Sequence, residues 1–588
     1  MVRQSTTTRR AVAALVGPLA AVGLIGAGTP AHAAGGSAAP VSVIVRTGSA
    51  QDSARVQAAV RAAGGTVDRP LALISGFAGH VPPAALTALR TTPGVTAVTT
   101  DQSVRLKADK WLDDGGKNAP VETIKKSAGG KKKDKSVDTA SLTGAGVGVA
   151  LIDSGIAPVP GLDQPGKVIN GPDLSFESQV PGLTNIDTYG HGTHMAGIIA
   201  GSDPATAAGT PRYDGLAPGA HLISLKVAAA DGASDVSQVI AGIDWVVAHR
   251  NDAGLNIRVL NLSFGTDSTQ SAALDPLSYA VEAAWRKGIV VVVSVGNDGP
   301  TATRVTMPAA NPYVIAVGAA DAAGTEARTD DTVAGFSTRG STARHADLLA
   351  TGRSVVSLRN PGSYIDTLYP GARVADAAGQ QRFFRGSGTS QAAAVVSGSV
   401  ALLLQQRPTL TPDQVKKLLI STADPIAGAD AVAAGAGQLD IAEAATLTPP
   451  KDKDATQNFP AATGLGTLEG ARGTSHVTDD TTGIDLRGEK DIFGATWNPK
   501  TWTAAAKDGK AWTGGSWNGT VWTGTAFTGT SWTTKTWAPA AWTAQNWAGR
   551  SWTGSAWTGR SWTAGAWTGR SWTSGTWCGR SWTSRSWV

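Results

Sequence analysis

The sequence predicts an α/β domain with a mostly parallel sheet over residues 144–446. Short runs rich in β-branched residues alternate there with segments whose apolar residues fall on one helical face. Such runs are typical of strands that are buried on both faces, as in parallel sheets covered by helices. The predicted strands span residues 147–152, 222–227, 259–264, 289–295 and 313–317. In this architecture, ligands bind at the carboxyl ends of the strands.

The first 33 residues predict an export signal. Arginines precede an apolar run over residues 11–25, and Ala31-His32-Ala33 follows as a cleavage site. The run is shorter than the ~20 residues that span a bilayer, which argues against a membrane anchor. No other stretch is long and apolar enough to cross a membrane. We therefore expect a secreted, extracellular protein whose mature chain begins near Ala34.

Residues 34–107 predict a small α+β domain. Strands are expected over residues 41–45 and 94–98, with one helix over residues 53–63 and a second after Pro83. Its position between an export signal and a large domain indicates a pro-segment, and an unrelated small domain is the alternative. The next residues, 108–143, are rich in Lys, Asp and Gly and predict a solvated linker.

Three side chains in the large domain have complementary proton-transfer chemistry. Asp153 follows the first predicted strand, His191 lies in a Gly-His-Gly-Thr-His segment, and Ser390 lies in Gly-Thr-Ser-Gln. A serine hydroxyl becomes a good nucleophile when an imidazole accepts its proton, and a carboxylate fixes the tautomer of that imidazole. The three residues therefore form a candidate catalytic triad.

Four segments resemble the subtilisin-like serine peptidases, and the resemblance covers about residues 144–445. The segments are Ala150-Leu151-Ile152-Asp153-Ser154-Gly155, His191-Gly192-Thr193-His194-Met195-Ala196-Gly197, Ser294-Val295-Gly296-Asn297-Asp298-Gly299 and Gly388-Thr389-Ser390-Gln391-Ala392-Ala393. The resemblance implies a three-layer subtilisin-like domain preceded by a ferredoxin-like inhibitory pro-domain. It also implies a secreted serine endopeptidase, made as a self-inhibited precursor, that hydrolyses peptide bonds through an acyl-enzyme. The alternative is a surface- or polysaccharide-binding protein with a degenerate, non-catalytic protease-like domain.

The resemblance assigns roles to the triad and to an amide. Asp153 orients His191, His191 is general base and then general acid, and Ser390 attacks the carbonyl carbon. The side chain of Asn297 donates to the oxyanion together with the backbone N–H of Ser390. His194 is the rival base, but it matches a structural position of the family.

Two further segments are implied to bind an extended polypeptide substrate. Ser263, Phe264 and Gly265 match the edge that pairs with peptide backbone, and Ser294, Val295 and Gly296 match a wall of the specificity pocket. The chain departs from the family at Gln391, Ala394 and Val395, which follow the serine. These changes remove no proton-transfer group, so they bear on rate and specificity more than on reaction type.

The expected partners are a polypeptide substrate and the chain's own pro-segment. No cofactor is required by the proposed chemistry. No acidic cluster with metal-ligand spacing is visible in the sequence, so calcium binding is left open as a property of the family.

Residues 447–490 predict a second linker, and residues 491–588 form a Trp-rich repeat. From Trp497 to Trp587 every fifth residue is Trp except Lys507 and Phe527, which makes 17 Trp in 19 positions. Five residues turn an α-helix by ~500°, so an α-helix would have no single apolar stripe. A β-solenoid, in which rings on successive coils could stack, or a turn-rich repeat fits this period better.

The repeat has nine basic residues and two acidic ones, so any attraction to anionic surfaces belongs to this tail. Its rings either form the core of the repeat or bind sugars and aromatic surfaces, and the sequence leaves both open. A polysaccharide or cell-wall surface ranks above nucleic acid as a partner, because no recognised nucleic-acid module is present. Retention of the secreted protein at the cell wall would follow from the binding role.

Overall fold

The computed structural model describes residues 40–71, 76–100, 117–128, 142–179, 183–203, 213–477, 487–491, 495–513 and 515–521, with three pairs at 556–557, 566–567 and 576–577. The predicted export signal and most of the Trp-rich repeat lie outside these residues. Within the described part of the chain, no helix combines the length and apolar character needed to cross a membrane.

The N-terminal domain has the order β-α-β-β-α-β. Its antiparallel sheet has the strand order β2-β3-β1-β4, with β1 at Val41–Thr47, α1 at Ala50–Ala62, β2 at Thr66–Leu71, β3 at Gly76–Val81, α2 at Pro83–Arg90 and β4 at Val95–Thr100. Ser49 caps helix α1, and its hydroxyl accepts from the backbone N–H of Asp52. Val56 and Val60 of α1 pack with Val45 and Phe77 in the core. This is the ferredoxin-like arrangement that the resemblance implies.

The large domain is built on one sheet with the strand order β14-β13-β12-β11-β6-β10-β7, and β15 also pairs with β13. All strand pairs are parallel except β13 with β14. The strands are β6 Gly148–Asp153, β7 Val168–Asn170, β10 His221–Lys226, β11 Ile257–Leu262, β12 Val290–Ser294, β13 Ile315–Asp321, β14 Thr332–Val333 and β15 Leu348–Thr351. The predicted α/β class is confirmed, and the five predicted strands are found within a few residues of their expected bounds.

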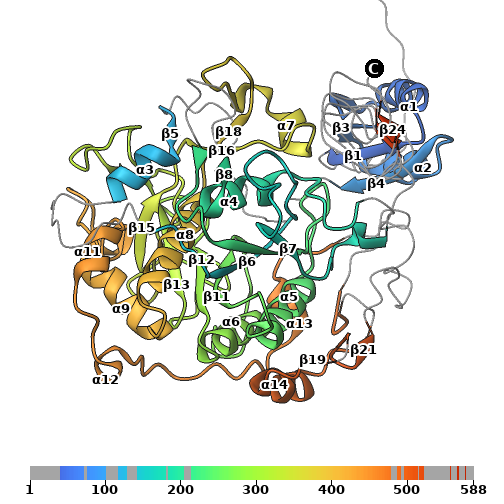
Figure 1. Ribbon diagram of the computed structural model, residues 1–588. Helices are drawn as coiled ribbons and strands as arrows, with labels where there is room; N and C mark the ends of the chain where they lie inside the picture. The colour runs from blue at the N-terminus through green and yellow to red at the C-terminus, as the bar shows by residue number, and fades with distance from the viewer. Residues whose placement is uncertain are drawn as a thin grey trace, which may run out of the picture. The chain divides into compact units, whose positions relative to one another are not determined.

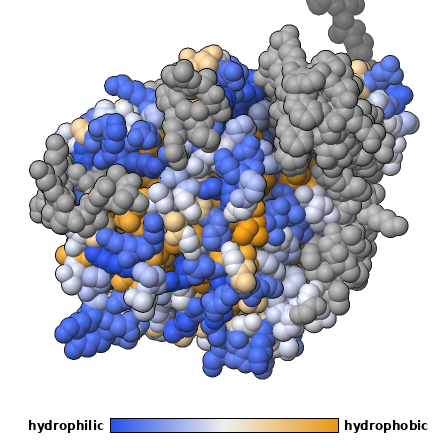
Figure 2. All heavy atoms as spheres, in the orientation of Figure 1, coloured by the Kyte–Doolittle hydropathy of each residue, from blue (hydrophilic) through white to orange (hydrophobic). Residues whose placement is uncertain are grey.

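Helices form the other two layers (Figure 1). Helix α4 (His191–Ala200) and helix α8 (Thr389–Gln406) pack against each other and against the sheet. Helices α5 (Val236–His249) and α6 (Pro276–Arg286) form a second packed pair, which contacts β6 and β12. Helices α9 (Pro412–Thr422) and α11 (Ile441–Thr446) pack together beside α8. The apolar core between these layers is continuous. On the face drawn in Figure 2, the coloured residues are mostly hydrophilic, with smaller hydrophobic patches near the middle.

The first expected linker, residues 108–143, contains ordered structure. Strand β5 (Ala119–Pro120) pairs with β16 (Val355–Leu358), and α3 (Val121–Ala128) follows it directly. Val121 and Ile124 are buried on one face of this helix. Residues 117–128 therefore belong to the large domain. The prediction of a linker rested on the charged composition of the surrounding residues and overlooked two apolar residues at helical spacing.

The second expected linker, residues 447–490, also differs from the expectation. It contains α12 (Asp452–Ala455) and α13 (Leu468–Arg472), and Leu468 and Ala471 are buried. Arg472 is fully buried and its Nε lies 2.7 Å from Oδ2 of Asp235, the residue that caps α5. Residues 447–477, named the strap from here on, are therefore packed on the large domain.

The first tryptophans of the repeat are buried against α5. They lie on or beside α14 (Pro499–Asp508), β19 (Trp512–Thr513) and β20 (Ser516–Trp517), which pairs with β21 (Thr520–Val521). The indole N–H groups of Trp502 and Trp517 both donate to Oδ2 of Asp244 at 2.8 Å, and that of Trp512 donates to the carbonyl of Ala241 at 2.6 Å.

The ring of Trp497 packs on two of these indoles, with centroids 4.9 Å from Trp502 and 6.2 Å from Trp517. We name Trp497, Trp502, Trp512 and Trp517 the Trp clasp. In the clasp the rings form a core, which was one of the two roles left open by the sequence.

Three short strands from later in the repeat pair with one another. Strands β22 (Ala556–Trp557), β23 (Ala566–Trp567) and β24 (Thr576–Trp577) are parallel, and each residue lies opposite the residue ten positions away. The first units differ from the expectation, because α14 is an α-helix: Asn498 caps it, and Lys507 replaces a Trp of the five-residue period within it. The solenoid or turn-rich form of the later units stays a prediction.

Candidate active site

Asp153 is the last residue of β6, in the middle of the sheet. Strands β10 and β11 flank β6 on both sides, so the carboxylate is fully buried at the carboxyl edge. The backbone N–H of Ser154 donates to Oδ1 of Asp153 at 2.8 Å. This strand end therefore holds a carboxylate in a fixed place, as the sequence predicts for a ligand edge.

His191 is the first residue of α4 and is buried beside Asp153. Its Nδ1 lies 2.7 Å from Oδ1 and 2.9 Å from Oδ2 of Asp153. Because a carboxylate can only accept, Nδ1 is the donor and the proton of the neutral ring resides there. In this tautomer Nε2 is the basic nitrogen, which is the form a general base requires.

His194 is buried one turn further along α4. Its Nε2 lies 3.1 Å from the carbonyl of Phe384, in β18 (Phe383–Gly386). Burial, with a smaller contribution from the nearby His191, lowers the pKa of His194 to about 3. His194 is therefore a neutral ring that joins α4 to the backbone of β18.

Ser390 is the second residue of α8, which packs against α4. The two helices thus begin with the candidate nucleophile and the candidate base. The hydroxyl of Ser390 is buried and has no hydrogen-bond partner among the described residues. The structure therefore joins Asp153 to His191 by a hydrogen bond, and a contact between His191 and Ser390 stays a prediction. Catalytic hydrogen bonds often tighten only when substrate is bound.

Asn297 follows β12 and is held by the residue before Ser390. Its Oδ1 accepts from the backbone N–H of Thr389 at 2.9 Å and from the hydroxyl of Thr389 at 3.0 Å. A backbone N–H can only donate, which identifies the facing atom of Asn297 as oxygen. The amide nitrogen, the donor that an oxyanion needs, is thereby oriented away from Thr389. The backbone N–H of Ser390 is one of the first N–H groups of α8, which have no acceptor within the helix.

The two candidate substrate-binding segments follow neighbouring strands. Ser263, Phe264 and Gly265 come after β11, and Ser294, Val295 and Gly296 end or follow β12, which pairs with β11. Parallel strands place both segments at the carboxyl edge that also carries Asp153. All six residues are buried in the structure. The backbone N–H of Gly296 donates to Oγ1 of Thr389 at 3.2 Å, which ties the second segment to the start of α8.

The sequence did not identify the buried residues that contact the candidate triad and Asn297. Thr389 holds Asn297, and Asp187 bonds to groups on both sides of the Asp153–His191 pair. Asp187 lies four residues before the candidate base in the sequence, but the segment Asp-Thr-Tyr-Gly is equally typical of a turn. Gln391, the departure next to the nucleophile, is fully buried in α8.

The described residues contain no group of three or more His, Cys, Asp or Glu side chains arranged to hold a metal ion. Calcium binding therefore gains no support from these residues, and it stays a property of the family alone.

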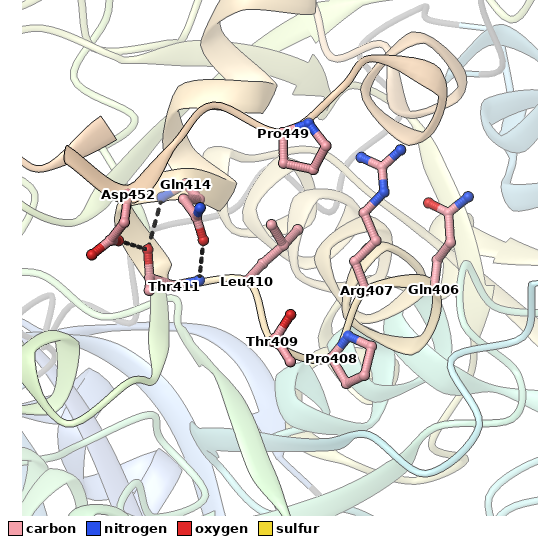
Figure 3. Close-up of a pocket in the computed structure, with 9 residues that line it drawn as sticks. All are labelled: Gln406, Arg407, Pro408, Thr409, Leu410, Thr411, Gln414, Pro449 and Asp452. Atoms are coloured by element: carbon pink, nitrogen blue, oxygen red, sulfur yellow. Dashed lines mark hydrogen bonds between the residues drawn. The ribbon is translucent and has the colours of Figure 1, made fainter. Parts of the chain in front are cut away.

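A surface pocket of about 670 Å³ lies near the end of α8 (Figure 3). It is lined by the end of α8, the start of α9 and Pro449, and its polar groups bond one another: Oγ1 of Thr411 accepts from the Gln414 N–H and donates to Asp452. Gln406, at the pocket, is sixteen residues from Ser390 along α8, which is about 24 Å at 1.5 Å per residue. The pocket is therefore not part of the candidate active site.

Two family models match the chain. The model described as "Subtilase family" matches residues 144–466, and the one described as "Putative peptidase inhibitor domain" matches residues 21–101. The first match extends beyond residue 446 into the strap. The second begins within the predicted export signal and covers nearly all of the predicted pro-segment.

Several characterised proteins are similar to this chain. Serine protease AprX of Bacillus subtilis is 40% identical over 303 residues, which are 50% of this chain and 65% of that protein, slightly less than two thirds of its length. Subtilisin E of Bacillus subtilis is 30% identical over 405 residues, covering 67% of this chain and 88% of that protein. The crystal structure of fervidolysin from Fervidobacterium pennivorans, described as a keratinolytic enzyme related to subtilisin, is 24% identical with a TM-score of 0.43, and covers 70% of this chain and 61% of that one.

The subtilase match spans more than half of the chain, and the four motif segments lie within it. An inhibitor-like domain of ferredoxin-like fold precedes it. The chain belongs to the subtilase family of serine peptidases.

Proposed function

We propose that this protein is a secreted serine endopeptidase that cleaves polypeptides through an acyl-enzyme. Ser390 attacks the substrate carbonyl, His191 accepts the serine proton and passes it to the leaving amine, and Asp153 orients His191 and stabilises its charged form. In the second half-reaction His191 accepts a proton from water, which attacks the acyl group and releases it from Ser390. No step of this mechanism requires a redox cofactor.

The observation that carries the proposal is the hydrogen bond of 2.7 Å between Nδ1 of His191 and Oδ1 of Asp153. Both groups are buried, so the carboxylate fixes the tautomer with little competition from water. The helix that begins at His191 packs against the helix that carries Ser390. A degenerate scaffold would have no need to keep this pair aligned, which favours the enzyme over the surface-binding alternative.

We assign the oxyanion site to Asn297 and to the backbone N–H of Ser390. The bonds from Thr389 to Oδ1 orient the amide, so its N–H group needs no rearrangement when negative charge develops. The N-terminus of α8 adds a favourable partial positive charge at the same place.

The proposed substrate is an extended polypeptide that pairs with Ser263–Gly265 and enters beside Ser294–Gly296. An added strand obtains main-chain hydrogen bonds, while pockets for alternate side chains give selectivity. The inhibitor-like domain is proposed to occupy this edge in the precursor, which would keep the protease inactive until the domain is removed.

Labelling with a fluorophosphonate tests the proposed nucleophile. The mature protein should be labelled and should cleave a peptide library, and Ser390→Ala should abolish both. Ser399→Ala is the matched control, because Ser399 is fully buried in the same helix and its hydroxyl bonds to none of the described groups. Absence of labelling in the folded, pro-segment-free wild type would refute the enzyme and favour the binding protein.

We also propose that the Trp-rich tail retains the enzyme at a cell wall or another polysaccharide surface. The Trp clasp is buried in the large domain, so a binding role would belong to repeat units beyond Val521. The basic excess of the tail supports attraction to anionic polymers.

A further inference from the structure

Asp187 is a buried carboxylate in the loop before α4. It is fully buried, and each of its two oxygens accepts two hydrogen bonds. Oδ1 accepts from the hydroxyl of Ser154 at 2.7 Å and from the backbone N–H of Gly190 at 2.6 Å. Oδ2 accepts from the backbone N–H of Thr193 at 2.8 Å and from its hydroxyl at 2.5 Å. All four donors are uncharged groups.

These donors flank both members of the Asp153–His191 pair. Ser154 directly follows Asp153, whereas Gly190 caps α4 just before His191 and Thr193 lies in its first turn. Asp187 therefore connects the strand end that holds the candidate orienting carboxylate with the helix start that holds the candidate base.

A second set of contacts closes the same junction. The backbone N–H of Gly192 donates to Oγ of Ser154 at 2.9 Å, and the backbone N–H of Ala157 donates to Oγ1 of Thr193 at 3.0 Å. The two segments approach so closely that a Cβ on Gly192 would lie 2.1 Å from the carbonyl oxygen of Gly155. The junction therefore leaves little room for adjustment if one of its polar groups is changed.

We propose that Asp187 is a positioning residue that sets the distance and angle between Asp153 and His191 through Ser154, Gly190 and Thr193. The inference rests on the proposed triad and adds a residue that acts through it. Misplacement of a catalytic group by about 1 Å can cost about 10²-fold in rate, so a rigid junction is expected to matter for turnover.

The electrostatic setting agrees with a role that depends on accepting hydrogen bonds. Burial raises the pKa of the Asp187 carboxyl, and the bonds from Thr193, Gly190 and Ser154 oppose that rise. An Asn at this position would keep the shape of the side chain. Its NH₂ group, however, would face two hydrogen-bond donors where the carboxylate has an accepting oxygen.

The test compares Asp187→Asn with a matched control, Asp275→Asn. Asp275 is also fully buried and accepts from neutral donors, the Ser278 N–H at 3.0 Å and the Ser268 hydroxyl at 2.6 Å, but it caps α6. We expect Asp187→Asn to lower kcat about 10- to 100-fold with KM within about twofold, and Asp275→Asn to lower kcat less than about twofold. Active enzyme is counted by fluorophosphonate titration, so incomplete maturation does not enter kcat. Thermal unfolding of each variant in a Ser390→Ala background measures the structural cost.

A double-mutant cycle with Ser154→Ala tests the route. If Asp187 acts through Ser154, the combined loss in kcat will be clearly smaller than the product of the two single losses. Should Asp187→Asn fail to fold, Thr193→Val and Thr193→Ser replace it: the first removes the Oγ1 donor and should lower kcat, and the second should restore it.

Three results would overturn the inference: unchanged kcat in Asp187→Asn, equal losses of kcat in Asp187→Asn and Asp275→Asn, or equal kcat in the two Thr193 variants. An inactive, unlabelled wild type would instead overturn the proposed triad, so the two failures can be told apart.

Discussion

The candidate active site and the Trp clasp are both built around a buried carboxylate that accepts from aromatic N–H groups. Asp153 accepts from the imidazole of His191 at 2.7 Å, and Asp244 accepts from the indoles of Trp502 and Trp517 at 2.8 Å. The rings differ in one respect: imidazole has a second nitrogen that can take up a proton, whereas indole only donates. The same hydrogen-bond geometry therefore suits the proposed proton relay at Asp153, whereas at Asp244 it joins the tail to α5.

The environments of the two carboxylates lead to different consequences. Asp244 receives two indole N–H groups, yet burial outweighs them and raises the pKa of Asp244 to about 7. A charge at Asp244 is thus costly in the folded protein, where this carboxylate accepts from two tryptophans of the clasp. The comparison predicts that Asp153 governs rate and that Asp244 governs stability.

The largest expected effect is the loss of rate when Asp153 becomes Asn. Asn cannot accept from Nδ1 of His191 in the same way and would favour the wrong tautomer, so Asp153→Asn should lower kcat by about 10⁴-fold. Asp244→Asn should leave kcat within about twofold, because it touches no group of the triad. Steady-state cleavage of a peptide by titrated enzyme measures both. Similar losses of rate in the two variants would remove the distinction drawn here.

Two truncations measure how much the strap and clasp contribute to stability. Removal of all residues after Thr446 would expose the sites of Trp502, Trp517 and Leu468, which are fully buried. At about 1.5–3 kcal/mol for each large apolar side chain, the loss should reach several kcal/mol. Removal of residues after Val521 keeps these contacts and should change the free energy of unfolding by less than about 1 kcal/mol.

Urea unfolding of both truncations in a Ser390→Ala background gives these free energies without self-digestion. The variant that lacks only the residues after Val521, tested with Ser390 intact, should also keep peptide cleavage. It should lose retention on cell-wall polysaccharide. Equal stability of the two truncations would show that the clasp contributes nothing, and unchanged retention would refute the adhesive role of the tail.

A further expected effect is a pH dependence of stability that comes from Asp244. Its pKa is about 7 in the folded protein against an ordinary value of 3.8, so between these pH values the folded state binds more protons than the unfolded state. The free energy of unfolding should therefore fall as pH rises through this window, by at most about 1.4 kcal/mol per pH unit. Asp244→Asn removes the titrating group. The free energy of unfolding of this variant, minus that of its parent, should therefore be more favourable at pH 8 than at pH 5. A variant whose relative stability is the same at both pH values would contradict the raised pKa.

The residues of the candidate active site could be named from the sequence because their signals are local. Asp153 follows a run of buried β-branched residues, and His191 and Ser390 lie in short segments whose neighbours are specific. The order of the three segments along the chain, Asp then His then Ser, further supported the resemblance to subtilisin-like peptidases. The partners Asp187 and Thr389 were not identified, since their roles depend on contacts between segments that only the folded chain brings together.

The clasp could not be predicted because a five-residue period carries no information about what the rings pack against. Lys507 and the helix-start pair Asn498-Pro499 mark the first units as different, but neither shows that their rings pack on α5. The buried strap was missed for a related reason: Arg472 sits in a polar stretch, and its partner Asp235 is 237 positions away along the chain. Long-range ion pairs of this kind have no signature in a single sequence.

The pairing of β22, β23 and β24 bears on how the tail can change length over evolutionary time. Trp557 lies opposite Trp567, and Trp567 lies opposite Trp577, so the pairing repeats every ten residues. Gain or loss of thirty nucleotides in this stretch of the gene would add or remove one whole unit and leave equivalent residues opposite each other. A change of fifteen nucleotides would instead put neighbouring strands half a unit out of step, since Arg550, Arg560, Arg570 and Arg580 recur every ten residues. Replication slippage in ten-codon steps is therefore the change that this pairing tolerates best.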